Sequence, residues 1–252
     1  MLGVDVYEPM GSKVAGPGTG HANLGHAGLG HPGLGQAVSA ARRDGPPSVQ
    51  PGLKRAFDLL GAGVLLLLAA PAFALLALLV RADGGPAFYA HERVGRGGRR
   101  FGCLKFRSMV TDSQYRLDTL LDADPAARAE WEATRKLKDD PRVTRIGRLL
   151  RATSLDELPQ LINALRGEMS LVGPRPVVRE ELDLHYSPAA AAAYCAMRPG
   201  ITGLWQISGR SATTYVERVA LDTRYVRTWS VRFDILILLK TIPAVLKRRG
   251  AI

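Results

Sequence analysis

The chain has 252 residues, enough for one sizeable hydrophobic core with appended segments. Its two cysteines, Cys103 and Cys195, have neither a metal-binding spacing nor the density of a disulfide-stabilised secreted scaffold, which excludes that class of protein. The formal net charge of +11 indicates a partner that is nucleic acid, an anionic membrane surface or a phosphorylated substrate, and charge alone does not separate these three.

Residues 1–50 are a low-complexity segment rich in Gly, Ala and Pro. Residues 20–35 repeat a five-residue unit (GHANL, GHAGL, GHPGL) with too few bulky side chains to pack a core. The repeat places His21, His26 and His31 at equal spacing, which could bind a metal, but a disordered tail is the favoured interpretation. No apolar run of the kind that forms a signal peptide occurs in the first thirty residues.

Residues 51–82 are predicted to form a membrane helix. Leu59–Val80 is a run of 22 residues without a charge, long enough to enter a bilayer. Pro71 lies near its middle and removes one helical hydrogen bond, and basic residues flank both ends, so the positive-inside bias gives no clean orientation. A re-entrant helix that enters and leaves on one face and a kinked spanning helix fit these features about equally.

Residues 83–252 are predicted to form one globular unit on the side of the basic loops, which is the cytoplasm. Ala87–Tyr89 and Arg100–Phe106 are predicted strands on either side of a turn at Gly95–Gly98. Residues 112–136 are charged and Ala-rich with helical spacing, which predicts one solvated helix.

The stretch Phe233–Leu246 is apolar and is followed by a basic cluster of Lys247, Arg248 and Arg249. This order is typical of an interfacial helix on anionic lipid. A buried core helix fits the pattern almost as well.

Two adjacent carboxylates, Asp156 and Glu157, lie in the densest group of polar residues. Ser154-Leu155-Asp156-Glu157 matches the capping box, in which Glu157 returns a hydrogen bond to the start of a helix, and spacing alone favours this structural role. The functional alternative is that one carboxylate attacks a phosphorus atom while its neighbour holds a divalent metal. Arginines around the pair suit this chemistry, because phosphoryl transfer places negative charge on oxygens.

Arg175 lies between Pro174 and Pro176, which fix the backbone on both sides of its guanidinium. That rigidity lowers the entropy lost when the guanidinium binds a phosphate. A proline-bounded turn with a surface arginine is the ordinary alternative.

Five segments, in order, resemble the bacterial sugar transferase family of monotopic phosphoglycosyl transferases over about residues 53–252. They are KRAFDLLGAGVLLLLAAP, FYAHERVGRGGRRFGCLKFRSM, RIGRLLRATSLDELPQLINALRGEMSLVGPRP, RPGITGLWQISGR and LDTRYV. The long insertion after KFRSM and the PGITGLWQISGR segment are similar to undecaprenyl-phosphate galactose phosphotransferases of exopolysaccharide synthesis.

The resemblance implies a compact α/β domain, layered α-β-α, with a re-entrant membrane helix and interfacial amphipathic helices. It places that catalytic domain on the cytoplasmic face of the bacterial inner membrane. The implied reaction moves a hexose-1-phosphate, such as that of galactose or glucose, from a UDP-sugar to polyprenyl (undecaprenyl) phosphate and releases UMP. This would be the first membrane step of exopolysaccharide or other glycoconjugate assembly.

The resemblance also implies the site residues. Asp156 and Glu157 would be catalytic, with Asp156 as the nucleophile of a covalent aspartyl intermediate and Glu157 as the ligand of the cofactor Mg²⁺. Substrate contacts are expected from Lys105, Arg151, Arg175, Asp222, Tyr225 and Arg210. The family's helix-breaking Ser-Pro pair is Ala70-Pro71 here, so the break depends on Pro71 alone.

The alternative from another class is a non-enzymatic basic scaffold anchored to a membrane, which leaves the SLDEL and PRP segments without a role. Nucleic-acid binding is not expected, because only 6% of residues are aromatic and no aromatic stripe accompanies the basic residues. The sequence leaves the transferred sugar and the oligomeric state open, and a homo-oligomer is compatible with it.

Overall fold

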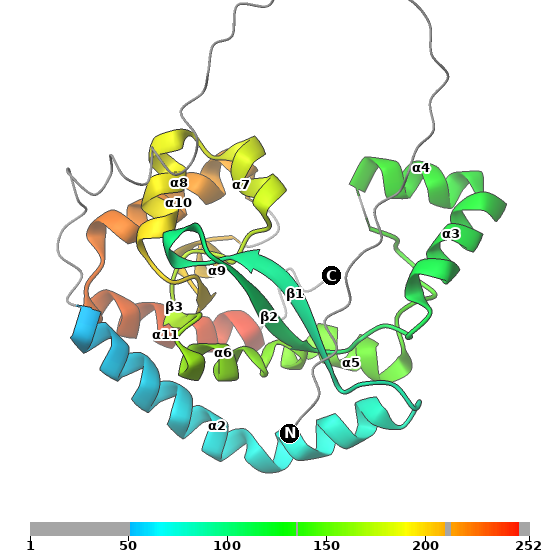
Figure 1. Cartoon of the computed structure of the whole chain (residues 1–252), viewed down its shortest axis with the longest axis horizontal. Coiled ribbons are helices and arrows are strands. Elements are labelled where there is room, and N and C mark those ends of the chain that lie inside the picture. The colour runs from blue at the N-terminus through cyan, green and yellow to red at the C-terminus, as the bar shows by residue number, and fades with distance from the viewer. Residues whose placement is uncertain (1–50, 135, 210–212, 247–252) are drawn as a thin grey trace, which may run out of the picture.

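The computed structural model describes residues 51–134, 136–209 and 213–246. The tail with its histidine repeat, Arg210 and the basic cluster at residues 247–249 therefore lie outside the described residues. Figure 1 shows the described elements on one side of a long, curved helix.

The long helix is α2 (Pro51–Arg81), which is continuous over 31 residues with Pro71 inside it. It curves beneath the remaining elements (Figure 1). By length and composition it could cross a membrane, and only 11% of its apolar window is buried. Leu60, Leu67 and Leu68 are among its exposed side chains, at 72, 76 and 74%. Its placement as a re-entrant helix stays a prediction.

The first two strands form a hairpin. β1 (Phe88–Val94) pairs antiparallel with β2 (Arg100–Phe106) through the short turn η1 (Arg96–Gly98). The bounds of β2 and the position of the turn are confirmed. β1 extends five residues beyond the predicted Ala87–Tyr89, because its polar His91-Glu92-Arg93 stretch hides the strand in the sequence.

The prediction of one helix over residues 112–136 is wrong, since the structure has two. α3 (Ser113–Ala123) ends at Asp124, whose backbone is extended, and α4 (Pro125–Thr134) begins at the next residue. Pro125 has no N–H to continue α3. The side chain of Asp124 accepts hydrogen bonds from the N–H groups of Ala126 and Ala127 and so starts α4.

The rest of the chain is a helical body around a second small sheet. β3 (Ser170–Val172) and β4 (Gly200–Thr202) pair in parallel. The helices are α5 (Arg145–Thr153), α6 (Gln160–Arg166), α7 (Arg179–His185), α8 (Pro188–Ala196), α9 (Leu204–Ile207), α10 (Tyr215–Thr228) and α11 (Val231–Leu246), with the turn η2 (Leu155–Glu157) between α5 and α6. The fold is thus mixed and helix-rich, with few strands. The interfacial placement of its helices stays a prediction.

One hydrophobic cluster joins the middle of this body to α2. It includes Ala62 of α2, Leu171 of β3, Tyr225 of α10 and Ile237 of α11, all buried. Because residues of four elements meet there, the first half of α2 is part of the core.

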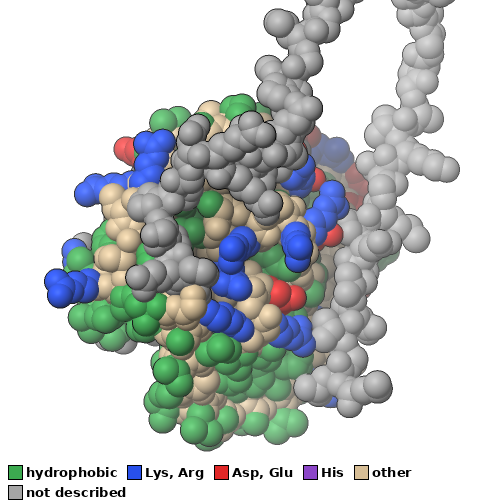
Figure 2. All heavy atoms as spheres, turned by 60° about the vertical axis from the view of Figure 1, so that its left-hand side comes forward, with side chains coloured by type: hydrophobic (Ala, Val, Ile, Leu, Met, Phe, Trp, Pro, Cys, Tyr) green, Lys and Arg blue, Asp and Glu red, His purple; other side chains and the backbone are tan. Residues whose placement is uncertain are grey.

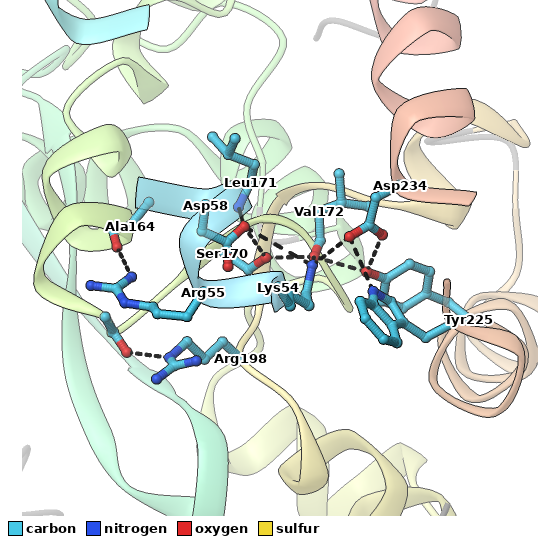
Figure 3. Close-up of polar contacts among 12 residues, drawn as sticks. Lys54, Arg55, Asp58, Ala164, Ser170, Leu171, Val172, Arg198, Tyr225 and Asp234 are labelled. Atoms are coloured by element: carbon cyan, nitrogen blue, oxygen red, sulfur yellow. Dashed lines mark hydrogen bonds and ion pairs between the residues drawn. The ribbon is translucent and has the colours of Figure 1, made fainter. Parts of the chain in front are cut away.

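A buried polar network holds the same end of α2 (Figure 3). The ammonium of Lys54 donates to Val172 O (3.0 Å) and to Asp234 Oδ2 (2.7 Å). The hydroxyl of Tyr225 lies 2.7 Å from Asp234 Oδ1 and 3.0 Å from Val172 O. Asp58 accepts from Ser170 Oγ at 2.8 Å. Buried charges of this kind need such partners, so the network fixes α2 to β3, α10 and α11.

The charged and the hydrophobic side chains occupy different regions of the surface. On the face in Figure 2, Lys and Arg side chains gather above a largely hydrophobic region. That region lies at the level of α2, whose outward leucines are exposed. A contiguous apolar surface of this kind marks a contact with lipid or another protein.

Candidate active site

Asp156 and Glu157 lie on η2, directly after α5 ends. Ser154 closes α5 in a left-handed conformation (φ 57°), and its side chain makes no capping hydrogen bond to the turn that follows. The carboxylate of Glu157 is bonded to Lys105 instead. The capping-box interpretation is therefore wrong: the spacing is present, but the reciprocal hydrogen bonds are not.

Lys105, which is distant in sequence, contacts both carboxylates. It lies on β2, and its Nζ is 2.7 Å from Glu157 Oε1 and 3.6 Å from Asp156 Oδ2. Three residues expected at the site from the family resemblance thus meet in space, although 51 positions separate Lys105 from Asp156.

Burial controls the titration of this group. The side chain of Asp156 is only 12% exposed, and desolvation raises its pKa, against the lowering effect of Lys105 and with a further increase from Glu157. Desolvation lowers the pKa of Lys105, but the neighbouring carboxylates outweigh it and the pKa is raised overall. Lys105 therefore stays charged, while the Asp156 carboxylate is poorly solvated and sits beside a fixed cation.

Arg151 lies on the last turn of α5, close enough to Asp156 to lower its pKa. Its Nε donates to Ser108 Oγ at 2.9 Å. α5 packs directly on this segment, since a Cβ at Gly147 would lie 2.0 Å from Ser108 O. The side chain of Arg151 is exposed and makes no other hydrogen bond to the described residues, which leaves the rest of its guanidinium to a ligand.

Arg175 follows β3 and belongs to a second part of the site. Its backbone N–H donates to Asp222 Oδ2 at 3.3 Å, and its guanidinium lies 5.1 Å from the centre of the Trp205 ring. Burial raises the pKa of Cys103 to about 11, and the charges of Lys105 and Arg175 both oppose that increase. Both cations therefore lie within electrostatic range of Cys103 on β2.

Asp222 and Tyr225, three residues apart on α10, have different surroundings. Asp222 is buried beside Arg175 and Tyr186, and burial raises its pKa to about 7. Tyr225 is fully buried in the Lys54 network, where its hydroxyl meets Val172 and Asp234. The structure brings Asp222 to Arg175, but it gives Tyr225 internal partners. Arg210 is outside the described residues.

Sequence reasoning missed Trp205 and Arg218, which pack against Arg175 and the Asp222 region. The guanidinium of Arg218 lies 4.5 Å from the centre of the Trp205 ring. One signal was available, because Arg218 precedes Asp222 by four residues and so shares its helix face.

The carboxylate pair suits a metal that is shared with a substrate. Within the described residues, no group of three or more His, Cys, Asp or Glu side chains could enclose an ion. Mg²⁺ is usually bound by one or two carboxylates together with substrate phosphates, so two adjacent carboxylates fit this mode. Lys105 now neutralises Glu157, and a metal there would share or take over that contact.

Comparison with known proteins gives consistent results. The family described as bacterial sugar transferase matches residues 49–248. A UDP-galactose-lipid carrier transferase of Erwinia amylovora is 56% identical over 199 residues, the exopolysaccharide production protein ExoY of Rhizobium meliloti is 55% identical, and an undecaprenyl-phosphate galactose phosphotransferase of Salmonella typhimurium is 53% identical. Each of these alignments covers 79% of the chain.

The relatives differ in length. The aligned region spans 41% of the Erwinia and Salmonella proteins but 87% of ExoY. An aligned stretch of 199 of the 252 residues always includes residues 54–199, and therefore both carboxylates, Arg151 and Arg175.

Proposed function

The chain belongs to the bacterial sugar transferase family, and from this premise we propose that it transfers a sugar-1-phosphate from a UDP-sugar to polyprenyl phosphate. The names of two relatives, a UDP-galactose-lipid carrier transferase and an undecaprenyl-phosphate galactose phosphotransferase, support undecaprenyl phosphate as the acceptor and a hexose as the sugar. The name of ExoY supports a role in exopolysaccharide assembly.

The observation that carries the proposal is the arrangement of Asp156, Glu157 and Lys105. A poorly solvated carboxylate is a better nucleophile than one in water, because less hydration is lost when it attacks. The fixed ammonium 3.6 Å away favours the ionised form of that carboxylate, against the effect of burial, and offsets the charge of an approaching phosphate.

In the first step, an oxygen of Asp156 attacks the β-phosphorus of the UDP-sugar. The bond between that phosphorus and the oxygen bridging to the α-phosphate breaks, and UMP leaves with the electron pair. Asp156 then carries the phosphosugar as an acyl phosphate. Arg151 and Arg175 bind phosphate oxygens in this step and orient the phosphorus for in-line attack.

In the second step, a phosphate oxygen of the polyprenyl phosphate attacks the same phosphorus. The bond between Asp156 and phosphorus breaks, which regenerates the free carboxylate and yields a polyprenyl diphosphosugar. Asp222 stays beneath Arg175 throughout and holds its backbone N–H.

Glu157 would hold Mg²⁺ together with phosphate oxygens of the donor. The ion would supply positive charge where phosphoryl transfer builds up negative charge. Lys105 holds the Glu157 carboxylate in place beside Asp156.

The site works at a membrane in this proposal. α2 would enter the cytoplasmic leaflet of the inner membrane as a re-entrant helix, and α11, which exposes Leu239 and Ile242, would lie at the interface with anionic lipid. The acceptor could then present its phosphate to Asp156 while its chain remains in the bilayer.

The test is an incubation of membranes that contain the full chain with polyprenyl phosphate and a panel of UDP-sugars labelled in the sugar. We expect label in the lipid fraction and UMP release with one hexose donor. A chain that acts as a basic scaffold would give neither product with any donor, and that result would refute the proposal.

A further inference from the structure

Trp205 of α9 is the centre of a cluster of cations. The guanidinium carbon of Arg218 lies 4.5 Å from the centre of its indole ring, and that of Arg175 lies 5.1 Å from it. Arg218 also lies 4.7 Å from the ring of Tyr215. Arg175, which follows β3, and Arg218 of α10 therefore contact the same aromatic ring. We call Trp205 and these two arginines the Trp205 cluster.

The Trp205 cluster contains hydrogen-bond donors without partners. Nε of Arg175, Nε of Arg218 and Nε1 of Trp205 are buried, and none of them has a hydrogen-bond partner in the described part of the chain. Buried polar atoms are almost always paired in native proteins, so three unpaired donors on three touching residues require an explanation. A guanidinium and an indole have no acceptor to offer, and the missing group must therefore be an acceptor.

The charge of the cluster is also incompletely balanced. Neither guanidinium forms an ion pair with a carboxylate among the described residues. Asp222 is an acidic group whose pKa both arginines lower against the effect of burial, and one of its oxygens, Oδ1, has no hydrogen-bond partner in the described part of the chain. Glu181 is engaged by the hydroxyl of Tyr215 at 2.9 Å and by Arg93. The ligand that completes the cluster should therefore be an anion.

We propose that Arg218 is a second phosphate-binding arginine, which acts with Arg175 on Trp205 to hold a phosphate group of a substrate. A guanidinium binds phosphate through two parallel hydrogen bonds, and stacking on an aromatic ring fixes its plane beforehand. The source of the phosphate rests on the proposed function. The donor carries it as a diphosphate and the lipid acceptor as a monoester.

Arg218→Gln tests the proposal, with Arg224→Gln as the matched control. Arg224 lies on the same helix, is exposed, and its substitution removes the same charge. The full chain in detergent is titrated by calorimetry with UDP and, separately, with a short-chain polyprenyl phosphate. We expect the Arg218 variant to bind one of these ligands at least about tenfold more weakly, the loss typical of a hydrogen bond to a charged group, and the Arg224 variant to bind as the wild type does.

The two titrations separate the sources. Weaker binding of UDP alone assigns Arg218 to the donor, and weaker binding of the polyprenyl phosphate alone assigns it to the acceptor. Arg218→Lys keeps the charge but loses the planar fork, so it should restore only part of the affinity. Thermal melting of Arg218→Gln should stay close to that of the wild type, because Nε of Arg218 has no hydrogen-bond partner among the described residues and only the stacking on Trp205 and Tyr215 is lost.

Unchanged binding of both ligands by Arg218→Gln would overturn the proposal, and so would a wild type that binds neither. Failure of the proposed function looks different. In that case the wild type binds UDP in a manner that needs Arg218 but forms no labelled lipid, and the phosphate site stands without the reaction.

Discussion

At the scale of single residues, the central feature is a buried carboxylate whose ionised form the fold destabilises. Asp156 is buried, and desolvation raises its pKa above the ordinary value of 3.8 despite the nearby Lys105. A buried charge of this kind lowers the stability of the fold and raises the reactivity of the site. Asp156→Asn should therefore abolish transfer and, at neutral pH, leave the free energy of unfolding equal to that of the wild type or higher.

The pH dependence of this difference follows from the direction of the shift. A raised pKa means that the folded state prefers protonated Asp156. Protonated Asp156 therefore contributes fully to the free energy of unfolding below pH 3.8, and this contribution is lost as the pH rises through the pKa of Asp156 in the folded state. Denaturant melts of both proteins should thus diverge with rising pH, in favour of Asp156→Asn. A variant that is less stable at neutral pH would show that the carboxylate stabilises the fold.

A substitution at Glu157 distinguishes two roles, helix capping and metal binding, that the sequence left open. Because it caps no helix, Glu157→Gln should leave the melting temperature nearly unchanged, while it lowers the rate and raises the Mg²⁺ concentration needed for half-maximal rate. Glu132→Gln, at an exposed position of α4, is the control for loss of one charge. An unchanged Mg²⁺ titration would show that Glu157 is not a ligand of the metal.

At this scale, the sequence predicted those site residues that form short local patterns. The adjacent Asp156 and Glu157 and the proline-flanked Arg175 are visible as short patterns, and family resemblance added Lys105. Arg218 and Trp205 were missed because their contact joins two segments, and the partners of Tyr225 lie 53 positions before it and 9 after it. Such contacts depend on tertiary structure.

At the scale of elements, the attachment of α2 depends on Lys54. Removal of one partner of a buried ion pair leaves an unpaired charge, which typically costs about 3–5 kcal/mol. We expect Lys54→Met to lower the free energy of unfolding by an amount of that order, because it leaves the buried carboxylates of Asp234 and Asp58 without their cation.

The double variant Lys54→Met with Asp234→Asn is the control for this prediction. It removes both charges of the closest pair and should recover part of the loss. Equal losses for the single and double variants would show that the ion pair contributes little and that the packing of α2 determines stability.

Secondary structure could be predicted where a pattern was local and unambiguous. The bounds of β2 and the turn before it match, as does the existence of α11. The break at Asp124 was missed because helical spacing continues through it, and two residues alone mark it: Asp124, which caps α4, and Pro125, which has no N–H. The spacing of a capping box at Ser154 misled for a related reason, since the left-handed backbone there is set by the end of α5.

At the scale of the whole molecule, the question is on which side of a membrane the two ends of α2 lie. α2 curves beneath the domain, its first half is anchored in the core, and its outward leucines are exposed. In a re-entrant arrangement both ends face the cytoplasm. Gly52→Cys and Ala82→Cys, each exposed and tested singly, should then react with a membrane-impermeant thiol reagent only when the cytoplasmic face is open.

The chain's own cysteines provide the background for this experiment. Cys103 and Cys195 are both buried, so the wild type should label weakly. Labelling of the two introduced cysteines from opposite faces would establish a spanning helix and contradict the re-entrant arrangement.

The account as a whole depends on a covalent bond between Asp156 and phosphorus, and mass spectrometry of the protein quenched after mixing with the UDP-sugar donor alone measures it most directly. We predict that, without acceptor, the wild type gains the mass of one phosphosugar at Asp156, that addition of polyprenyl phosphate removes it, and that Asp156→Asn never acquires it. Labelled lipid that accumulates while no adduct forms at Asp156 would contradict the account.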